Sequence, residues 1–367
     1  MYQNRNTNQM KTIFDKIHGF IDIEDDVLEF VDTFEFQRLR RIKQLGTACF
    51  VYPNASHTRF EHSLGVFFLA QKVVQSLQKK HPTLIDKSFE KCLTVAALCH
   101  DLGHLAYSHT SDNYIADTPH LFDKIGTHEH RSIEIFKKIV EKKQLEFYQF
   151  EIAMVCEMIN PSFQKKDLWF YSILSNNFFD IDRADYVVRD SLNLGISVNF
   201  SKHDALRIIN GMYIDERTKK ICYAEKTKSL IQNLSDSRFT LHKHVYQHRV
   251  TIATAEMVRD IFELTFHIDW QDYLHIDDSI IFYLPHLHGE NSPVAELVDR
   301  LNERDLYYTR VVQTQKKSFV LKHLNPEFYT VSDCFWQGKE KYVAFTLKHK
   351  TEETLKLFEK GLESFKI

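Results

Sequence analysis

The scarcity of glycine and proline is the feature that most limits the folds open to this chain. Its 367 residues include only 10 Gly and 7 Pro, whereas globular proteins use roughly 7% and 5% of these residues. Both residues interrupt helices, and a turn-rich β sandwich needs them at its many turns. Hydrophobic residues make up 43% of the chain, which suffices for a large core. The composition therefore predicts a mainly α-helical globular protein with long helices.

Apolar periodicity places the expected helices along the chain. In the segment Thr58 to Lys80, His62 shares one stripe with Val66, Leu69 and Val73 by four-three-four spacing, which predicts an amphipathic helix with His62 facing the interior. The segment Phe89 to Cys99 is apolar nearly all round, which predicts a buried helix. Further helices are expected near 35–45, 128–142, 150–159, 167–176, 181–194, 202–210, 229–265, 293–303 and 351–365.

Two signals of β structure interrupt this helical pattern. Met212 to Ala224 alternates around Glu216-Arg217-Thr218, which predicts a short hairpin. A segment rich in Pro and Gly between 284 and 294 precedes strand-like runs at Leu306–Val312 and Tyr342–Leu347. We therefore expect a flexible tail over residues 1–10, a helical domain over 11–280 and a small C-terminal α+β lobe over 281–367.

Charge and cysteine usage exclude several classes of protein. A net charge of -3 is incompatible with a strongly basic nucleic-acid coat or a strongly acidic chain. The 6 cysteines form no CxxC pair, which predicts free thiols in a reducing compartment. The first ten residues lack a signal-peptide core, and no apolar run reaches the roughly 18 residues of a membrane span. The expected location is intracellular: cytoplasmic, or nuclear if the source is eukaryotic, without membrane contact.

The sharpest chemical feature is the pair His100-Asp101 at the end of the apolar run 93–99. A buried carboxylate beside an imidazole needs a partner, either a metal ion or an arginine. Taken alone, such a pair is more often a satisfied buried pair than a ligand set. Gly103-His104, Ser108-His109, Asp112 and His128-Glu129-His130 follow closely. So many imidazoles in one stretch favour a metal or acid–base site.

Two other segments admit both a structural and a functional interpretation. A lone histidine on an apolar face, such as His62, is more often a hydrogen-bonded core residue than a ligand. The segment Ile181 to Asn193 gathers its polar residues on one broad helical face: Asp182, Asp185, Tyr186, Arg189, Asp190 and Asn193. That face is either solvated and crossed by internal ion pairs, which spacing alone favours, or it is the wall of a cleft that carries a metal-binding carboxylate.

Taken together, His62, His100-Asp101 and Asp182 give the order H…HD…D on three helices, which resembles the HD-domain metal-dependent phosphohydrolases. The runs 36–46 and 55–66 are similar to the deoxynucleoside triphosphate triphosphohydrolases of that superfamily. These include the catalytic domain of the animal sterile-alpha-motif-and-HD-domain dNTPase and the bacterial dGTP triphosphohydrolases. The similarity continues at 100–104, 108–109, 127–129, 185–190 and 245–248, and it covers roughly residues 11–260.

This resemblance implies an enzyme that hydrolyses a deoxynucleoside triphosphate to a deoxynucleoside and inorganic triphosphate. The implied metal ligands are His62, His100, Asp101 and Asp182, which would hold Fe, Mn, Zn or Mg and so activate the water that attacks the α-phosphorus. A further Mg ion would bridge the substrate phosphates. The implied catalytic residues are His109, which would protonate the leaving 5′ oxygen, Asp112, which would orient it, and His104 and His128, which would hold the α-phosphate and the bridging water.

The resemblance also implies substrate and regulatory contacts. Arg59, Arg183 and Arg238 would clamp the β- and γ-phosphates with their guanidinium forks. The residues implied to pack around the sugar and base are Gln44, Leu45, Tyr186, Asp190, His242, Tyr246 and Gln247. The family forms homo-oligomers, here a dimer or a tetramer. An activating guanine nucleotide would be read at a subunit interface by Lys11, Asp32, Gln37 and Arg40. Because Phe14 and Ala224 replace two polar residues of that site, we expect activation to be weak, altered or absent.

Two alternative functions remain open at this stage. The first is an HD phosphohydrolase that acts on another nucleotide, either a nucleoside monophosphate or a cyclic nucleotide. The second is a non-catalytic, nucleic-acid-binding HD protein with a vestigial site. The arginines and the sugar-facing residues argue against the first alternative, and the intact H…HD…D set argues against the second.

Overall fold

The computed structural model describes residues 10–161, 169–176, 178–265, 274–314, 327, 329–337 and 340–363. Residues 1–9 of the expected tail and part of the expected helix 167–176 lie outside these ranges. The chain divides into two compact units that interleave along the sequence: 1–44, 54–239 and 270–277 in the first, and 45–53, 240–269 and 278–367 in the second. The domain boundary near residue 280 stays a prediction.

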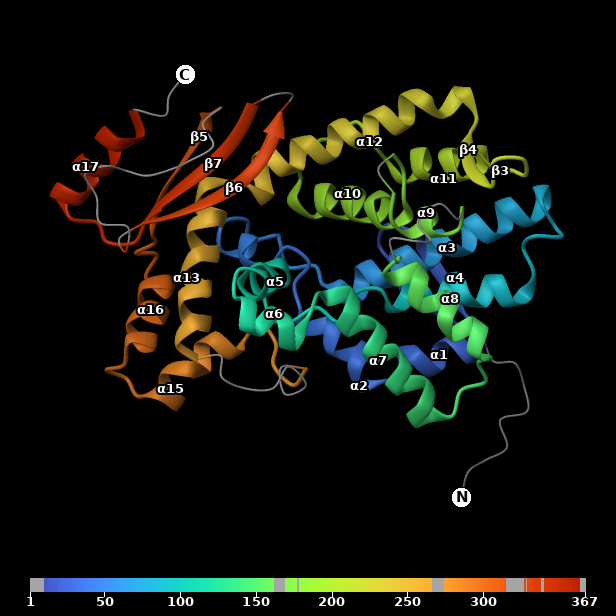
Figure 1. The fold of residues 1–367 in the computed structure, drawn as a ribbon, viewed down its shortest axis with the longest axis horizontal. Helices are drawn as coiled ribbons and strands as arrows, with labels where there is room; N and C mark the ends of the chain where they lie inside the picture. The colour runs from blue at the N-terminus through green and yellow to red at the C-terminus, as the bar shows by residue number, and fades with distance from the viewer. Residues whose placement is uncertain are drawn as a thin grey trace. The chain divides into compact units, whose positions relative to one another are not determined.

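The mainly α-helical prediction is confirmed (Figure 1). Residues up to 241 form β1 (Lys11–Asp15), β2 (Gly19–Ile23), α1 (Asp25–Val31), α2 (Phe34–Gln37), α3 (Arg59–Lys80), α4 (Lys87–Cys99), α5 (His109–Ala116), α6 (Pro119–Ile125), α7 (His128–Lys143), α8 (Gln149–Ile159), α9 (Tyr171–Leu174), α10 (Ile181–Leu194), α11 (Lys202–Gly211), β3 (Met212–Asp215), β4 (Lys220–Tyr223) and α12 (Lys228–Leu241). Later residues form α13 (Arg249–Thr265), α15 (Leu284–His288), α16 (Pro293–Asn302), β5 (Tyr308–Thr314), β6 (Tyr329–Gln337), β7 (Glu340–Leu347) and α17 (Glu352–Glu363). Short 3₁₀ turns cover Arg38–Arg41, Gly46–Phe50, Glu225–Thr227 and Ile280–Tyr283, and a π-helical turn covers His242–Tyr246.

Local sequence explains where the two central helices begin. Thr58 and Glu61 form a capping box at the start of α3, in which the Thr58 amide donates to Glu61 Oε2 at 2.7 Å. Asp86 caps α4 by accepting from the Phe89 amide at 2.7 Å. Every residue from Cys92 to Cys99 is buried, as the apolar run predicts. The end of α4, and with it His100, therefore lies in the interior.

Helix α10 packs against α3 through its polar face. Asp185 and Arg189 are fully buried, whereas Leu192 on the nominally apolar face is 63% exposed. The interpretation of this face as solvated is therefore wrong. Gly65 on α3 makes the approach feasible, because a Cβ at that position would lie 2.0 Å from Asp185 Oδ1.

Three small sheets complete the fold. The predicted hairpin is confirmed as β3 and β4, which pair antiparallel with Asp215 opposite Lys220. In the second unit, β5, β7 and β6 form an antiparallel sheet in that order. One face of this sheet shares a core with α17 through Val343, Phe345 and Phe358, among others. The predicted C-terminal α+β lobe is thus confirmed.

The sequence patterns missed strands β1, β2 and β6 and helices α5, α6 and α15. In β1 only Asp15 is buried, whereas Phe14 is 66% exposed and pairs with Phe20, which is 72% exposed. A strand whose aromatic residue faces solvent and whose buried residue is charged lacks the alternation by which strands are recognised.

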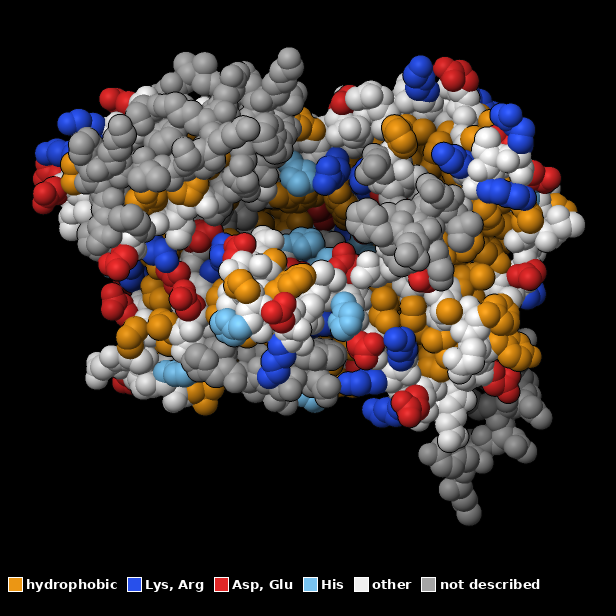
Figure 2. All heavy atoms as spheres, in the orientation of Figure 1, with side chains coloured by type: hydrophobic (Ala, Val, Ile, Leu, Met, Phe, Trp, Pro, Cys, Tyr) orange, Lys and Arg blue, Asp and Glu red, His pale blue; other side chains and the backbone are white. Residues whose placement is uncertain are grey.

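The face of the molecule drawn in Figure 2 carries interspersed charged side chains of both signs among the residues drawn in colour. Among the described helices, none combines the length and apolar character that a bilayer crossing requires. The cysteines whose side chains are described, Cys49, Cys92, Cys99, Cys156 and Cys222, are all free thiols.

Candidate metal centre

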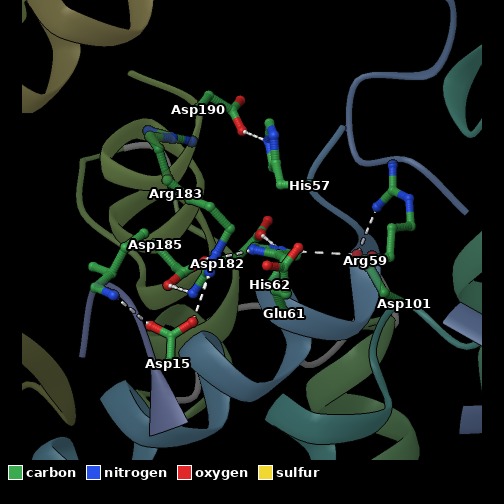
Figure 3. A network of polar contacts seen from close by, with 12 residues as sticks. Asp15, His57, Arg59, Glu61, His62, Asp101, Asp182, Arg183, Asp185 and Asp190 are labelled. Carbon is green, nitrogen blue, oxygen red and sulfur yellow. Dashed lines mark hydrogen bonds and ion pairs between the residues drawn. The ribbon is translucent and has the colours of Figure 1, made fainter. Parts of the chain in front are cut away.

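Three helices of the first unit bring the H…HD…D residues together, and Figure 3 shows His62, Asp101 and Asp182 among them. His62 lies one turn into α3, His100 follows the last residue of α4, and Asp182 lies in the first turn of α10. Nε2 of His62 is 2.9 Å from Asp182 Oδ1 and 3.8 Å from Asp101 Oδ2. Nε2 of His100 is 3.7 Å from Asp182 Oδ1. One ligand atom each from His62, His100 and Asp182 can therefore meet within 4.8 Å.

The donor set fits a divalent metal ion. His100 uses Nδ1 in a 2.9 Å contact with the Ala97 carbonyl, and its buried Nε2 has no hydrogen-bond partner among the described residues. That nitrogen faces Asp101 Oδ1 at 3.4 Å. An orphaned imidazole nitrogen beside two carboxylates is a set of donors suited to Fe, Mn or Zn.

Electrostatics keep the carboxylates of this cluster ionised. Burial alone would raise the pKa of Asp182, but its contacts with His100 and His62 lower it below the usual range. Burial likewise opposes ionisation of Asp101, yet Arg59 and His100 hold its pKa well below the usual range. Burial lowers the pKa of His62, but Asp182 and Asp185 more than offset this and raise it to about 10. Without an ion, the His62 imidazolium supplies positive charge between the carboxylates.

Arg59 lies beside the candidate ion site rather than on the open surface. It is 2% exposed, and it donates from Nη1 to Asp101 Oδ2 at 2.5 Å and from Nε to Ser108 Oγ at 2.8 Å. Its Nη2 is buried without a hydrogen-bond partner among the described residues. Arg59 therefore orients Asp101 and keeps a spare donor for an anion.

The four expected catalytic residues form a second cluster next to Asp101. His104 Nε2 is 3.3 Å from Asp101 Oδ1, and its ring stacks on His128 with centroids 4.0 Å apart. Asp112 Oδ2 lies 2.9 Å from His104 Nδ1, 3.6 Å from His128 Nδ1 and 3.7 Å from His109 Nδ1. The side chain of His109 is 67% exposed, so it is the imidazole of this cluster that solvent reaches most freely.

A buried arginine supports this histidine cluster. Arg131 on α7 donates from Nε to the Gly103 carbonyl at 2.8 Å, from Nη1 to the Gly126 carbonyl at 2.7 Å, and from Nη2 to Asp112 Oδ1. Burial lowers the pKa of His104, and burial together with His104 holds the pKa of His128 well below the usual range. Both imidazoles are therefore neutral near pH 7.

Part of the expected substrate set also meets in the first unit. Arg238 Nε donates to Tyr186 Oη at 2.8 Å, and burial raises the pKa of Tyr186 to about 12. Arg183 donates to the Asn176 carbonyl at 2.8 Å.

Other expected substrate residues are buried or belong to the second unit. The Asp190 carboxylate is buried and accepts from His57 Nε2 at 2.8 Å, and Gln44 is also buried. Leu45, His242, Tyr246 and Gln247 are residues of the second unit. There, His242 and Tyr246 meet edge to face at 4.8 Å on the π-helical turn.

The residues expected to read a guanine nucleotide pair with one another. Lys11 Nζ lies 3.4 Å from Asp32 Oδ2. Arg40 donates from Nε to Gln37 Oε1 at 2.8 Å, and its guanidinium lies 3.5 Å from the centre of the Phe60 ring. The structure thus forms two local pairs from the four residues, and their role in regulation stays a prediction.

The sequence patterns missed the partners of His62 on its other side. Asp185 Oδ2 lies 2.8 Å from His62 Nδ1, and Asp185 Oδ1 lies 2.7 Å from His18 Nε2. Arg189 joins Asp185 to Asp15. The four-residue spacing of Asp185 and Arg189 signals an ion pair on one helix, but no sequence signal links either residue to His18.

Two parts of this chain match known protein families. Residues 59–190 match the HD domain, and residues 203–327 match the HD associated region. The chain therefore carries an HD domain followed by an HD associated region, and all eight expected metal and catalytic residues lie inside the HD match.

The relatives narrow the class further. The chain is 35% identical over 73% of its length to an HD domain-containing protein of Acanthamoeba polyphaga mimivirus, of which it covers 62%. It is 32% identical over 81% of its length to the deoxynucleoside triphosphate triphosphohydrolase SAMHD1 homolog of Dictyostelium discoideum, of which it covers 59%. It is 34% identical over 73% of its length to deoxynucleoside triphosphate triphosphohydrolase SAMHD1 of Homo sapiens, of which it covers 46%. The chain thus spans about half to three fifths of the length of these relatives.

Proposed function

We propose that this protein is a metal-dependent hydrolase that converts deoxynucleoside triphosphates to deoxynucleosides and inorganic triphosphate. The observation that carries the proposal is the convergence of His62, His100 and Asp182 beside a layer of neutral imidazoles. The SAMHD1 relatives are named as deoxynucleoside triphosphate triphosphohydrolases, which suggests the reaction, and the site has donors for a metal ion and for phosphate oxygens.

The proposed ion is held by His62, His100, Asp101 and Asp182. A divalent ion there would polarise a phosphoryl oxygen and acidify water. The water oxygen forms a bond to the α-phosphorus, and the bond from that phosphorus to the 5′ oxygen breaks. His109 supplies the proton that the 5′ oxygen gains, with Asp112 Oδ2 at 3.7 Å from its Nδ1 to orient the ring. The attacking water loses a proton to solvent, and the exposed His109 regains its proton from solvent, so the step balances.

The remaining residues bind and orient the substrate in this proposal. His104 and His128 would hold the α-phosphate and the bridging water, and Arg59 offers its spare Nη2 to a neighbouring phosphate oxygen. The pair Tyr186–Arg238 presents a neutral phenol next to a guanidinium, which suits a sugar beside a charged phosphate chain. Arg183 would add a further phosphate donor, and Gln44 and Asp190 would contact the sugar. A Mg ion would supply further positive charge to the phosphates. These cationic donors favour a triphosphate over a monophosphate or a cyclic nucleotide. The roles that the resemblance implies for Leu45, His242, Tyr246 and Gln247 stay predictions.

Identification of the first products tests this function. Purified protein is incubated with each dNTP and Mn²⁺ or Mg²⁺, and the phosphate products are separated by ion-exchange chromatography. We expect one inorganic triphosphate per deoxynucleoside. Asp182→Ala should abolish the reaction, while Asp215→Asn, a change at the exposed β3–β4 turn, should not. Deoxynucleoside monophosphate with pyrophosphate as first products would refute the proposal.

We also propose that the protein works as a homo-oligomer, a dimer or a tetramer, and that any regulatory nucleotide binds near Lys11, Asp32, Gln37 and Arg40. The support is the family resemblance together with the exposed position of Lys11 and Asp32 on the surface. Light scattering of the purified protein, with and without GTP, measures the oligomer and its response.

A further inference from the structure

His62 makes a contact that the proposed reaction does not use. Its Nδ1 lies 2.8 Å from Asp185 Oδ2, on the side of the ring opposite Nε2. Asp185 is fully buried and is surrounded by donors. Arg189 contacts both of its oxygens, from Nε at 2.8 Å and from Nη2 at 3.1 Å, and His18 Nε2 approaches Oδ1 at 2.7 Å.

These contacts determine which nitrogen of His62 carries the retained proton. An ionised carboxylate can only accept hydrogen bonds, and the Arg189 guanidinium contacts both oxygens of Asp185, as a cation paired with a carboxylate does. Nδ1 of His62 must therefore be the donor, which directs the Nε2 lone pair to the ion whenever that nitrogen is deprotonated. Carboxylates that orient metal-binding imidazoles in this way also raise their basicity.

The first hairpin contributes to the same network. Asp15, the last residue of β1, accepts from the His18 amide at 2.8 Å through Oδ1 and from Arg189 Nη1 at 2.9 Å through Oδ2. The His18 ring stacks on Phe68 of α3 with centroids 4.7 Å apart. The turn between β1 and β2 is therefore held against α3 and α10 from two directions.

We propose that His18 is a positioning residue of the metal centre: through Asp185 it fixes the orientation and tautomer of His62. This proposal rests on the proposed metal site. It makes the β1–β2 hairpin part of the site, although the hairpin precedes the HD match, which begins at residue 59.

A purely structural role explains His18 less well. Arg189 already neutralises Asp185, so charge balance does not require an additional donor. The stacking on Phe68 needs only an aromatic ring, yet His18 also buries Nδ1 without a hydrogen-bond partner among the described residues. A buried, unsatisfied polar atom is costly, and phenylalanine would avoid that cost. What the imidazole adds is the donor that faces Asp185.

The test separates the ring from its donor. His18→Phe keeps the ring on Phe68 and removes the donor, whereas His18→Gln replaces the Nε2 donor by an amide at a similar reach. Zn²⁺ affinity is measured by competition with a chromogenic chelator, and the visible spectrum of the Co²⁺ protein reports ligand geometry. Ile208→Ala in α11 serves as a control, because it truncates a fully buried side chain that has no polar atom to share in the hydrogen bonds of the network.

We expect His18→Phe to weaken Zn²⁺ binding about tenfold, the lower end for outer partners of metal ligands, and to alter the Co²⁺ spectrum. His18→Gln should restore most of both. For dNTP hydrolysis, His18→Phe should lower kcat and leave KM nearly unchanged. Unchanged Zn²⁺ affinity and spectrum in His18→Phe would overturn the proposal, as would a loss that Ile208→Ala reproduces and His18→Gln does not restore. A wild-type protein that binds Co²⁺ but releases no triphosphate would refute the proposed function alone.

Discussion

Replacing Gly65 by alanine tests whether the close contact between α3 and α10 holds the candidate metal centre together. In an isolated helix this change is favourable, because alanine is preferred over glycine by about 1 kcal/mol in a helix interior. Here the added Cβ would lie 2.0 Å from Asp185 Oδ1 and 2.4 Å from Arg189 Nη2. The Asp185 carboxylate would have to move away from its partners.

The expected magnitude follows from these two opposing effects. Separation of a buried ion pair costs about 3–5 kcal/mol, and the gain in helix propensity recovers about 1 kcal/mol of this. We therefore expect Gly65→Ala to lower the free energy of unfolding by about 2–4 kcal/mol, a large share of the roughly 5–15 kcal/mol that stabilises a native protein. The displaced carboxylate would also release His62, so metal binding should weaken.

Urea titration followed by far-UV circular dichroism measures the change in stability, and metal analysis of the dialysed protein measures occupancy. Ser63→Ala is the matched control: it places alanine two residues earlier on the same helix, where the serine hydroxyl is buried without a hydrogen-bond partner among the described residues. That variant should be as stable as the wild type or more stable. If Gly65→Ala proved as stable as Ser63→Ala and kept its metal, the packing argument would be wrong.

Three further outcomes are expected. The pKa of His62 is raised to about 10, so the metal-free imidazole is protonated at pH 7. Metal binding should therefore release a proton, and metal affinity should increase as the pH rises toward 10. Titration calorimetry in buffers of different ionisation enthalpy measures the proton released. Arg131→Met leaves Asp112 buried without its guanidinium, so it should cost about 3–5 kcal/mol of stability, measured by urea titration. Phe14 and Ala224 remove two polar contacts expected at the regulatory nucleotide site, each worth roughly 1.5–3 kcal/mol when charged. GTP should therefore stimulate hydrolysis of a non-guanine dNTP weakly or not at all. Hydrolysis that strictly requires GTP would contradict this expectation.

The helices and the order of the candidate ligands could be predicted because both are local properties of the sequence. The stripe through His62 and Val66 predicted a buried face of α3, and the apolar run before His100 predicted a buried α4; both faces are buried. The predicted starts of α3 and α10 agree with the structure, in which Thr58 and Asp180 cap these helices.

The polar face of α10 could not be interpreted from spacing alone. A row of acidic and basic residues is usually solvated, and nothing in the segment itself shows that Asp185 and Arg189 are buried. The deciding feature lies on another helix, because only a residue without a side chain at position 65 lets this face approach α3 so closely.

The same reasoning explains why the hairpin stayed hidden and why it bears on function. Strand β1 lacks apolar alternation because its only buried residue, Asp15, is polar and contacts Arg189 of α10. His18, in the turn that follows β1, is also buried and contacts Asp185 of α10. His18 and Asp185 are 167 residues apart, a separation that no local pattern can bridge. A polar residue at a buried strand end obscures the strand in the sequence, and the contact that buries it also reaches the candidate metal ligand His62. The elements that were hardest to predict here are therefore those whose polar residues are buried against the candidate site.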